Sequence, residues 1–215
     1  MSILSSARFF TTVAQMRQLP RGDIAEVAFV GRSNAGKSSA LNVLCQRKRL
    51  AFASRTPGRT QALNFFAVGP EPVVSAYLVD TPGYGYAVAP HEVKKEWGLL
   101  GGRYLQSRSQ LSGVVLIVDI RRRLTALDQA LLDWIAPGQR LLVIASKSDK
   151  LSRSEQVQAG RAIHDAVLAH RKEAPDRVIL FSATARTGVE EARSVIESWL
   201  CAAPKKTPAL EDAGV

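Results

Sequence analysis

The sequence has few cysteines, few acidic residues and no long apolar run. Its two cysteines, Cys45 and Cys201, exclude a disulfide framework, and neither lies at a metal-ligand spacing. No apolar run approaches the ~20 residues of a membrane-spanning helix, and no long apolar segment follows Met1, as a secretory signal requires. Residues 2–22 contain serine and arginine but no acid, a composition also found in organellar presequences. We therefore expect a cytoplasmic protein, with import into an organelle as the alternative.

The shortage of acidic residues makes the chain strongly basic. Against 19 Asp and Glu stand 29 Lys and Arg, so the formal net charge is +10. An excess of this size favours an anionic partner such as RNA, DNA or a membrane surface, and the alternative is a merely basic soluble enzyme. Hydrophobic residues make up 46% of the 215 positions, which is enough to form the core of one ordinary domain.

Six short segments are predicted to form strands. Two of them, Ala62–Val68 and Val73–Val79, flank the turn-forming segment Gly69–Pro72, and this spacing predicts an antiparallel hairpin at one edge of the sheet. The other four are continuous apolar runs, the pattern of parallel strands buried on both faces: Glu26–Val30, Gly113–Val118, Leu141–Ala145 and Val178–Phe181.

Helical spacing of apolar residues occurs between these strands, over 93–104, 124–135 and 189–199. Thr125 and Asp128 resemble a capping box at the start of the second of these helices. Alternating strands and helices predict an α/β three-layer sandwich with a six-stranded, mostly parallel sheet and one antiparallel edge strand. We expect an N-terminal extension over 1–22, the domain itself over 23–201 and a loose tail over 202–215. The tryptophans are interpreted as core anchors: Trp97, Trp134 and Trp199.

A phosphate-binding motif follows the first apolar strand. The residues Gly31-Arg32-Ser33-Asn34-Ala35-Gly36-Lys37-Ser38 match GxxxxGK[ST] and precede a helix predicted from Lys37 toward Gln46. Glycines let the backbone wrap around phosphates with its N–H groups pointing inward, and the helix N-terminus adds a positive dipole end. Lys37 supplies a charge for the β and γ phosphates, and Ser38 offers a hydroxyl to Mg²⁺. The motif predicts a P-loop.

Further ligands for Mg²⁺ are expected in the next two loops. Because Mg²⁺ keeps several waters, few protein ligands are needed. Asp80 follows an apolar strand and opens Asp80-Thr81-Pro82-Gly83, where the Gly83 N–H is suited to sense a γ-phosphate. Thr60 lies in the polar loop between the first helix and the second strand, so this loop is a switch candidate. We expect Ser38, Thr60 and Asp80 at the metal, the last through water.

The base-reading end of the site is predicted at Ser146-Lys147-Ser148-Asp149, which closes an apolar strand at the edge where open α/β sheets bind ligands. Asp149 can accept hydrogen bonds from guanine N1–H and N2–H₂, whereas adenine offers no such donor pair and would leave the carboxylate unpaired. The aliphatic stem of Lys147 can lie against the base. Ser182 and Ala183 follow another strand and place a backbone N–H near the guanine oxygen.

Together these motifs resemble the EngB/YihA/YsxC family of bacterial GTPases, within the TrmE-Era-EngA-EngB-septin-like group with a Ras-like G domain. The resemblance runs from about Arg8 to Leu200 and is carried by the P-loop, Thr56–Gln61, Asp80–Tyr86 and Asp119–Arg121. It implies a role in assembly of the large ribosomal subunit, with a linked role in cell division and septation.

By position, the resemblance implies that Lys37, Thr60 and Gly83 act in hydrolysis. It also implies a set of nucleotide contacts beyond the P-loop: Gly58, Arg59, Thr60, Gln61, Ala62, Asp80, Thr81, Pro82, Gly83, Ser146, Lys147, Ser148, Asp149, Phe181, Ser182 and Ala183. Ser146 stands where many GTPases have Asn and this family often has Thr; it keeps a hydroxyl and lacks the amide. The cofactors implied are GTP or GDP and Mg²⁺.

Hydrolysis is expected to be slow without help. Ras-like enzymes orient the attacking water with a Gln just after the glycine that Gly83 matches; here that position is Tyr84. Asn34 resembles the P-loop Asn of potassium-activated relatives and is a candidate K⁺ ligand; its alternative role is to stabilise its own loop. Arg59 is a weaker candidate for stabilising transferred charge.

Clustered basic residues suggest contacts with rRNA phosphates, although most such clusters are simply solvated faces. We hypothesise that nucleotide state controls their presentation and that Tyr84 and Tyr86 stack on unpaired bases. Two functions remain open: a GTPase switch acting on a precursor of the large subunit, and an rRNA- or protein-binding module that uses GTP as a structural ligand. We expect a monomer. The basic groups are Arg47–Arg49, Lys94-Lys95, Arg103, Arg108, Arg121–Arg123 and Arg171-Lys172.

Overall fold

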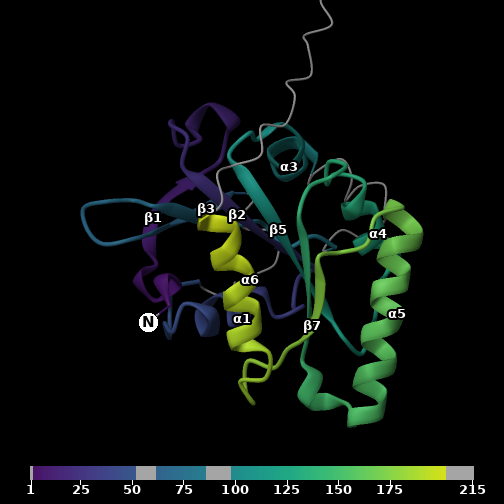
Figure 1. Ribbon diagram of the computed structural model, residues 1–215. Coiled ribbons are helices and arrows are strands. Elements are labelled where there is room, and N and C mark those ends of the chain that lie inside the picture. Colours follow the sequence, from purple (N-terminus) through teal and green to yellow (C-terminus); the bar gives the residue numbers. More distant parts are fainter. Residues whose placement is uncertain (1, 52–61, 86–97, 202–215) are drawn as a thin grey trace, which may run out of the picture.

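One mixed β-sheet runs through the middle of the molecule (Figure 1). The computed structural model describes residues 2–51, 62–85 and 98–201. Seven strands follow the order β1-β3-β4-β2-β5-β6-β7 across the sheet. Their bounds are β1 Arg8–Val13, β2 Ala25–Gly31, β3 Leu63–Val68, β4 Ala76–Asp80, β5 Leu111–Asp119, β6 Leu141–Ser146 and β7 Arg177–Leu180.

The predicted α/β fold is confirmed, but the sheet has seven strands and not six. Strands β4, β2, β5, β6 and β7 pair in parallel, and β3 pairs antiparallel with β4, as the predicted hairpin requires. The additional strand is β1, which pairs antiparallel with β3 and takes the edge that the hairpin was predicted to occupy. Edge strands bury less of their surface, and β1 accordingly has partly exposed residues instead of a continuous apolar run.

The N-terminal segment is therefore part of the sheet's own packing. Ser2 Oγ donates to Glu197 Oε1 on α6 at 2.5 Å, and Leu4 is fully buried. Gly69 N, beyond the end of β3, donates to Ser6 Oγ at 2.8 Å. These contacts tie the start of the chain both to the last helix and to the β3–β4 turn.

Helices cover both faces of the sheet (Figure 1). Helices α1 and α6 contact each other on one face, and α4 and α5 contact each other on the other, where α3 also packs. Among the described residues, no helix is both long enough and apolar enough to cross a membrane. The bounds are α1 Lys37–Leu44, α3 Arg103–Ser107, α4 Ala126–Leu132, α5 Arg153–Arg171 and α6 Val189–Cys201, with short turns at Ile3–Ser6, Met16–Gln18, Gly98–Gly102 and Ser148–Lys150.

Strand alternation divides the core into two. On β2, Val27 and Phe29 face α1 and α6, whereas Ala28 and Val30 face α3, α4 and α5. Successive side chains of a strand point to opposite faces, so a strand covered on both sides must be apolar throughout. This explains the continuous apolar runs. Because β2, β4, β6 and β7 run in the same direction, the loops that follow them lie at the same edge of the sheet.

Two tryptophans pack against glycines that leave room for their rings. A Cβ on Gly113 of β5 would lie 2.2 Å from Trp199 Cε3, and one on Gly102 would lie 2.4 Å from Trp134 Cε3. Trp199 is buried and Trp134 packs on the opposite core, which agrees with their interpretation as core anchors. Trp97 lies outside the described residues.

Helix boundaries follow their caps. The predicted capping box is confirmed: Thr125 and Asp128 close the first turn of α4 through reciprocal hydrogen bonds. Helix α5 was not predicted, although Ser152 and Glu155 form the same kind of box at its start.

Candidate nucleotide-binding site

The P-loop connects the carboxyl end of β2 to the start of α1. Gly36 is the N-cap of α1 with φ +100°, and Asn34 also has a positive φ of 66°. These left-handed residues curl the chain tightly between strand and helix. Gly31 has no room for a side chain, since a Cβ there would lie 2.8 Å from the Ile117 carbonyl oxygen on β5.

Asp80 lies beside the P-loop because β4 is the parallel neighbour of β2. Lys37 Nζ donates to Asp80 Oδ1, and both side chains are about one-tenth exposed. Thr81 fixes the turn that follows: its N and its Oγ1 both donate to the Phe29 carbonyl oxygen, at 3.1 and 2.9 Å. The sheet thus brings together the lysine and the carboxylate that the sequence placed 43 residues apart.

Gly83 approaches the P-loop closely. A Cβ on Gly83 would lie 2.9 Å from Ser33 Oγ and 3.1 Å from Ser33 N. Ser33 N donates to the Tyr84 carbonyl oxygen at 3.0 Å, and Ser33 Oγ to that of Gly83 at 3.4 Å. A shift of the Gly83 segment would therefore displace Ser33 in the P-loop, and a shift of the P-loop would displace Gly83.

The donor set at this point suits Mg²⁺. Ser38 on the first turn of α1 offers a hydroxyl, and Asp80 offers a carboxylate, both oxygen donors of the kind that Mg²⁺ prefers. Within the described ranges, no group of three or more His, Cys, Asp or Glu side chains could hold a metal alone. Two oxygen ligands completed by phosphates and water fit a nucleotide-linked Mg²⁺.

The predicted base-reading segment Ser146–Asp149, called the guanine motif below, forms hydrogen bonds with the P-loop. Ser146 Oγ lies 2.5 Å from the Ala35 carbonyl oxygen and 3.1 Å from that of Val118, so a hydroxyl at this position reaches the P-loop without the amide of an Asn. Lys147, with φ 60°, directs its Nζ to the Asn34 carbonyl oxygen at 2.8 Å. The two ends of the predicted site therefore share hydrogen bonds.

Asp119 also takes part in the connection between the guanine motif and the P-loop. Sequence patterns had assigned it no role of its own. It ends β5 and accepts from Lys147 Nζ at 3.0 Å and from Arg121 Nη2 at 2.7 Å. Burial alone would raise the pKa of Asp119, but hydrogen bonds from Arg121 and Lys147 outweigh it and hold this pKa well below its usual range. In the sequence, Asp119-Ile120-Arg121 was recognised only as part of the family resemblance. Its proximity to Lys147 could not be seen there.

Asp149 lies next to the loop after β7. Ser182 Oγ donates to Asp149 Oδ1 at 2.6 Å, and Lys150 Nζ lies 3.1 Å from Oδ2. The hydrogen bond from Ser182, followed by that from Lys150, lowers the pKa of Asp149. Phe181 is buried and its carbonyl oxygen accepts from Ser148 N at 3.0 Å, while Ala183 is half-buried. The structure thus places both parts of the predicted base site together.

Part of the predicted site lies outside the described residues: Gly58, Arg59, Thr60 and Gln61, together with the rest of 52–61. Ala62 is buried just before β3. The chain leading toward this loop is held by Asn42 of α1, whose Oδ1 accepts from Leu50 N and Ala51 N, each at 2.9 Å. No sequence signal marked Asn42, because an Asn on a helix is ordinarily a surface residue.

Tyr84 is buried, so in this structure its ring is not presented for stacking on an unpaired base. It is 3% exposed, and its hydroxyl donates to Asp128 Oδ1 at 2.7 Å. Burial, then the Asp128 carboxylate, raises the pKa of Tyr84 well above its ordinary value. The capping-box signal had marked Asp128 only as a helix cap. Tyr86 lies outside the described residues.

Comparison with known proteins bears on this arrangement. Residues 26–147 match the family described as "50S ribosome-binding GTPase". The chain is 51% identical over 202 residues to the "Probable GTP-binding protein EngB" of Burkholderia thailandensis, covering 92% of each chain. The protein of the same name from Burkholderia cenocepacia is 50% identical over the same length and coverage.

Solved structures share the fold at low sequence identity. A crystal structure of a probable GTP-binding protein EngB aligns with a TM-score of 0.61 and 17% identity, covering 82% of this chain and 98% of that one. Era in complex with MgGDPNP and nucleotides of 16S ribosomal RNA aligns with a TM-score of 0.60 and 19% identity, covering 89% and 60%. The sequence identity to the relatives above, together with the family match, shows that this chain is a GTPase of the EngB family of GTP-binding proteins.

Proposed function

We propose that this GTPase is a nucleotide-dependent switch in assembly of the large ribosomal subunit, with a linked role in cell division and septation. The observation that carries the proposal is the match of residues 26–147 to 50S ribosome-binding GTPases. The meeting of P-loop, Asp80 and guanine motif at one sheet edge supports it. The protein acts in the cytoplasm as a monomer.

The residues have distinct roles in this proposal. The P-loop Gly31–Ser38 holds the phosphates; Lys37 exchanges its contact with Asp80 for the β and γ phosphates. Ser38, Asp80 through water, and Thr60 would hold Mg²⁺, which would neutralise charge on the phosphates. Asp149 reads guanine, and Lys147 supports the base from a position fixed by Asn34 and Asp119. Chelation of Mg²⁺ with EDTA is expected to weaken GTP binding.

Slow intrinsic hydrolysis follows from the place of Tyr84. A hydroxyl bonded to Asp128 in the core cannot orient the attacking water as a Gln does. Activation must therefore come from elsewhere, and Asn34 is the candidate within the P-loop because its side chain is exposed at a left-handed turn. K⁺ held there would offset transition-state charge. Equal turnover in K⁺ and Na⁺ would remove this part of the proposal.

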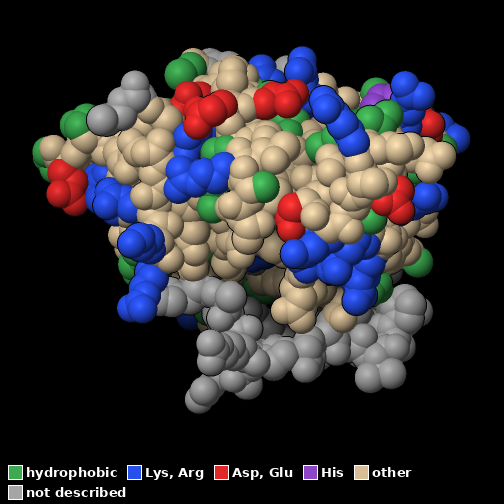
Figure 2. All heavy atoms as spheres, turned by 90° about the horizontal axis from the view of Figure 1, so that it is seen from below, with side chains coloured by type: hydrophobic (Ala, Val, Ile, Leu, Met, Phe, Trp, Pro, Cys, Tyr) green, Lys and Arg blue, Asp and Glu red, His purple; other side chains and the backbone are tan. Residues whose placement is uncertain are grey.

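The basic groups divide into two kinds. Arg47–Arg49 and Arg121–Arg123 are exposed. Arg121 is paired with Asp119, and the other residues of these two groups are available for rRNA phosphates. Arg108 pairs with buried Glu26, and Arg171 donates to the Ala136 carbonyl oxygen, so both serve the fold instead. Lys94 and Lys95 lie outside the described residues. Figure 2 looks onto the end at which α5 and α6 begin, and Lys and Arg outnumber Asp and Glu across that face.

Co-sedimentation with purified ribosomal subunits tests the proposal, with GDP compared against a non-hydrolysable GTP analogue at fixed salt. We expect association with the large subunit in the GTP form only. The double variant Arg122→Ala, Arg123→Ala should weaken association and flatten its salt dependence. The double variant Arg21→Ala, Arg161→Ala, which removes two exposed charges outside the basic groups, serves as the matched control.

The alternative function predicts a different result. A binding module that uses GTP as a structural ligand would associate with rRNA or a protein equally in both nucleotide states. No association in either state would contradict the ribosomal role and direct the search to protein partners.

A further inference from the structure

Tyr84 is held between the P-loop and α4. On one side, its carbonyl oxygen accepts from Ser33 N at 3.0 Å, and its backbone pairs with Arg32 in a parallel bridge. On the other side, its hydroxyl donates to Asp128 Oδ1 at 2.7 Å. Gly83, the residue directly before it, is the one expected to sense the γ-phosphate.

Asp128 divides its two oxygens between two elements. Oδ1 accepts from Tyr84, while Oδ2 accepts from Thr125 N at 2.8 Å and Thr125 Oγ1 at 2.7 Å. Asp128 is 1% exposed, so its carboxylate depends on these protein donors. The same group therefore holds both Tyr84 and the first turn of α4.

The chain after Tyr84 also lies directly on α4. Gly85 has φ +86°, and a Cβ there would come within 3.0 Å of Leu127 Cδ1. The Arg121–Arg123 turn stands just before α4 and is exposed. Segments far apart in the sequence thus form a continuous contact from the P-loop through Tyr84 to α4 and its basic turn.

Movement at Gly83 cannot leave this contact unchanged. A shift of about one ångström at the Tyr84 hydroxyl takes it out of hydrogen-bond range of Asp128, and a buried carboxylate oxygen without its donor is costly. Either the first turn of α4 follows Tyr84, or the hydrogen bond breaks and the turn loosens. Both results change how the Arg121–Arg123 turn is presented.

We infer that Tyr84 is a positioning residue that couples the nucleotide state of the Gly83 segment to the first turn of α4 and the Arg121–Arg123 turn. The inference rests on the proposed nucleotide switch and specifies its route. The partner of that turn is the phosphate backbone of RNA.

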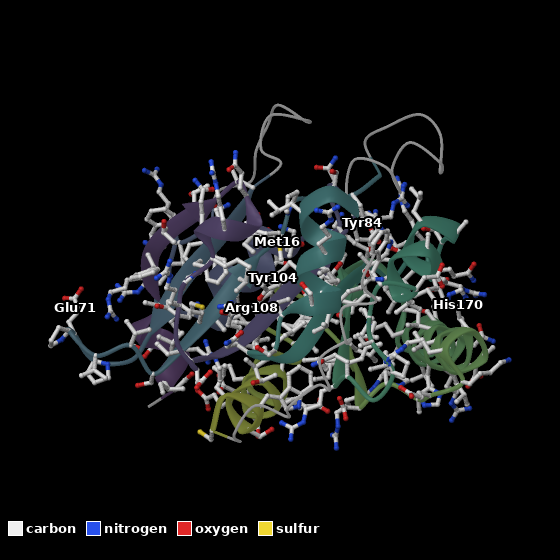
Figure 3. The ribbon with its side chains drawn as sticks, turned by 90° about the horizontal axis from the view of Figure 1, so that it is seen from above. Met16, Glu71, Tyr84, Tyr104, Arg108 and His170 are labelled. Atoms are coloured by element: carbon white, nitrogen blue, oxygen red, sulfur yellow. The ribbon has the colours of Figure 1, made fainter. Side chains whose placement is uncertain are left out.

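The chain contains a matched control for this residue. Tyr104 of α3 is also a buried tyrosine, and its hydroxyl donates to a buried carboxylate, Glu26 Oε2, at 2.8 Å. Glu26 lies near the start of β2, at the opposite end from the P-loop. Tyr84 and Tyr104, both labelled in Figure 3, belong to the same hydrophobic core but bond to different carboxylates. Replacing either by Phe removes the same kind of bond from a buried site.

Hydrogen–deuterium exchange of amides 125–132 tests the coupling in the full chain, at saturating GDP or non-hydrolysable GTP analogue with Mg²⁺. In the unchanged protein and in Tyr104→Phe, we expect the exchange rates to differ between the two states by about fivefold or more. In Tyr84→Phe, the two states should exchange alike. If Tyr84→Phe fails to fold, Asp128→Asn is compared with Thr125→Ala, which removes a capping hydrogen bond from the same carboxylate but keeps the bond from Tyr84. The difference between the two states should be lost in Asp128→Asn and kept in Thr125→Ala.

Retention of the full difference in Tyr84→Phe would overturn the inference, as would the absence of any difference in the unchanged protein. Neither result needs the ribosome. The co-sedimentation experiment can therefore fail while the coupling stands, and the coupling can fail while the chain still associates with the large subunit.

Discussion

Lys147 of the guanine motif donates to the main-chain oxygen of Asn34 in the P-loop, at 2.8 Å. The same ammonium lies 3.0 Å from Asp119 Oδ2. The phosphate and base ends of the site are therefore one connected unit, and a change at Asp119 should be felt by the nucleotide without touching it.

The first prediction concerns Asp119→Asn. Loss of the charge loosens the long Lys147 side chain, whose Nζ keeps its hydrogen bond to the Asn34 carbonyl oxygen. Ordering such a side chain again on binding costs about 1–2 kcal/mol. We expect GDP affinity to fall about tenfold, measured by titration with a fluorescent GDP analogue. Asp133→Asn, which removes a surface carboxylate paired with His170, should have no effect. Equal affinity of Asp119→Asn and the unchanged chain would contradict the prediction.

The second prediction is a pH dependence. Ser182 stabilises the charged form of Asp149 and lowers its pKa, so Ser182→Ala should raise that pKa toward the ordinary value of about 3.9. Because guanine recognition needs the carboxylate, GDP affinity should begin to fall at a higher pH in the variant as the solution is acidified.

Titration of GDP affinity between about pH 7 and pH 3 measures this shift, because that range includes the ordinary Asp pKa of about 3.9. Ser2→Ala is the control, because Ser2 makes the same kind of hydrogen bond to Glu197 at 2.5 Å, near the end of α6 and outside the base site. Coincident curves for Ser182→Ala and the unchanged protein would show that Ser182 does not set the pKa of Asp149.

The third prediction compares the effect on stability of replacing two glycines, Gly113 and Gly160, by alanine. Gly113→Ala would place a Cβ within 2.2 Å of the Trp199 ring, so we expect a loss of about 1–3 kcal/mol in unfolding free energy. Gly160→Ala meets only Leu180 Cδ2, at 3.3 Å, within helix α5, where Ala is favoured over Gly by about 1 kcal/mol. Denaturant unfolding should give opposite signs, and equal losses would argue against the assigned Trp199 packing.

The fourth prediction concerns the buried pair of Arg108 and Glu26. Arg108 Nη2 lies 2.5 Å from Glu26 Oε1 and also donates to the Pro20 carbonyl oxygen at 2.7 Å. Arg108→Met leaves a fully buried carboxylate without its cation, which costs about 3–5 kcal/mol. Arg177→Met, which breaks an exposed pair with Glu191, should cost less than about 1 kcal/mol. Similar melting temperatures for the two variants would refute this ranking.

Sequence patterns correctly predicted those strands and turns whose residue types are dictated by burial or by backbone conformation. Strand β2 is buried on both faces and so is apolar throughout, and the P-loop needs its glycines for backbone conformation. Helix α5 was missed because it buries few apolar residues, among them Ala159, Ile163 and Val167, on an otherwise polar helix. Strand β1 was missed because an edge strand carries only a weak pattern.

Contacts between distant polar residues could not be predicted in this way. Tyr84 and Asp128 are 44 positions apart, and neither residue type signals a buried partner. Asp119 was visible as part of a signature, but its pairing with Lys147 depends on β5 and β6 being neighbours in register. Sheet topology, not sequence spacing, brings these groups together.

The place of β1 at the edge of the sheet has a practical consequence for preparing the protein. A chain shortened to begin at residue 23 would keep every motif of the site, yet β3 would lose its outer neighbour β1, and the position of Leu4 in the core would be empty. An uncovered strand invites pairing with another molecule. Such a truncated protein would tend to aggregate during purification, whereas a chain that keeps Ser2 also keeps its hydrogen bond to Glu197 on α6.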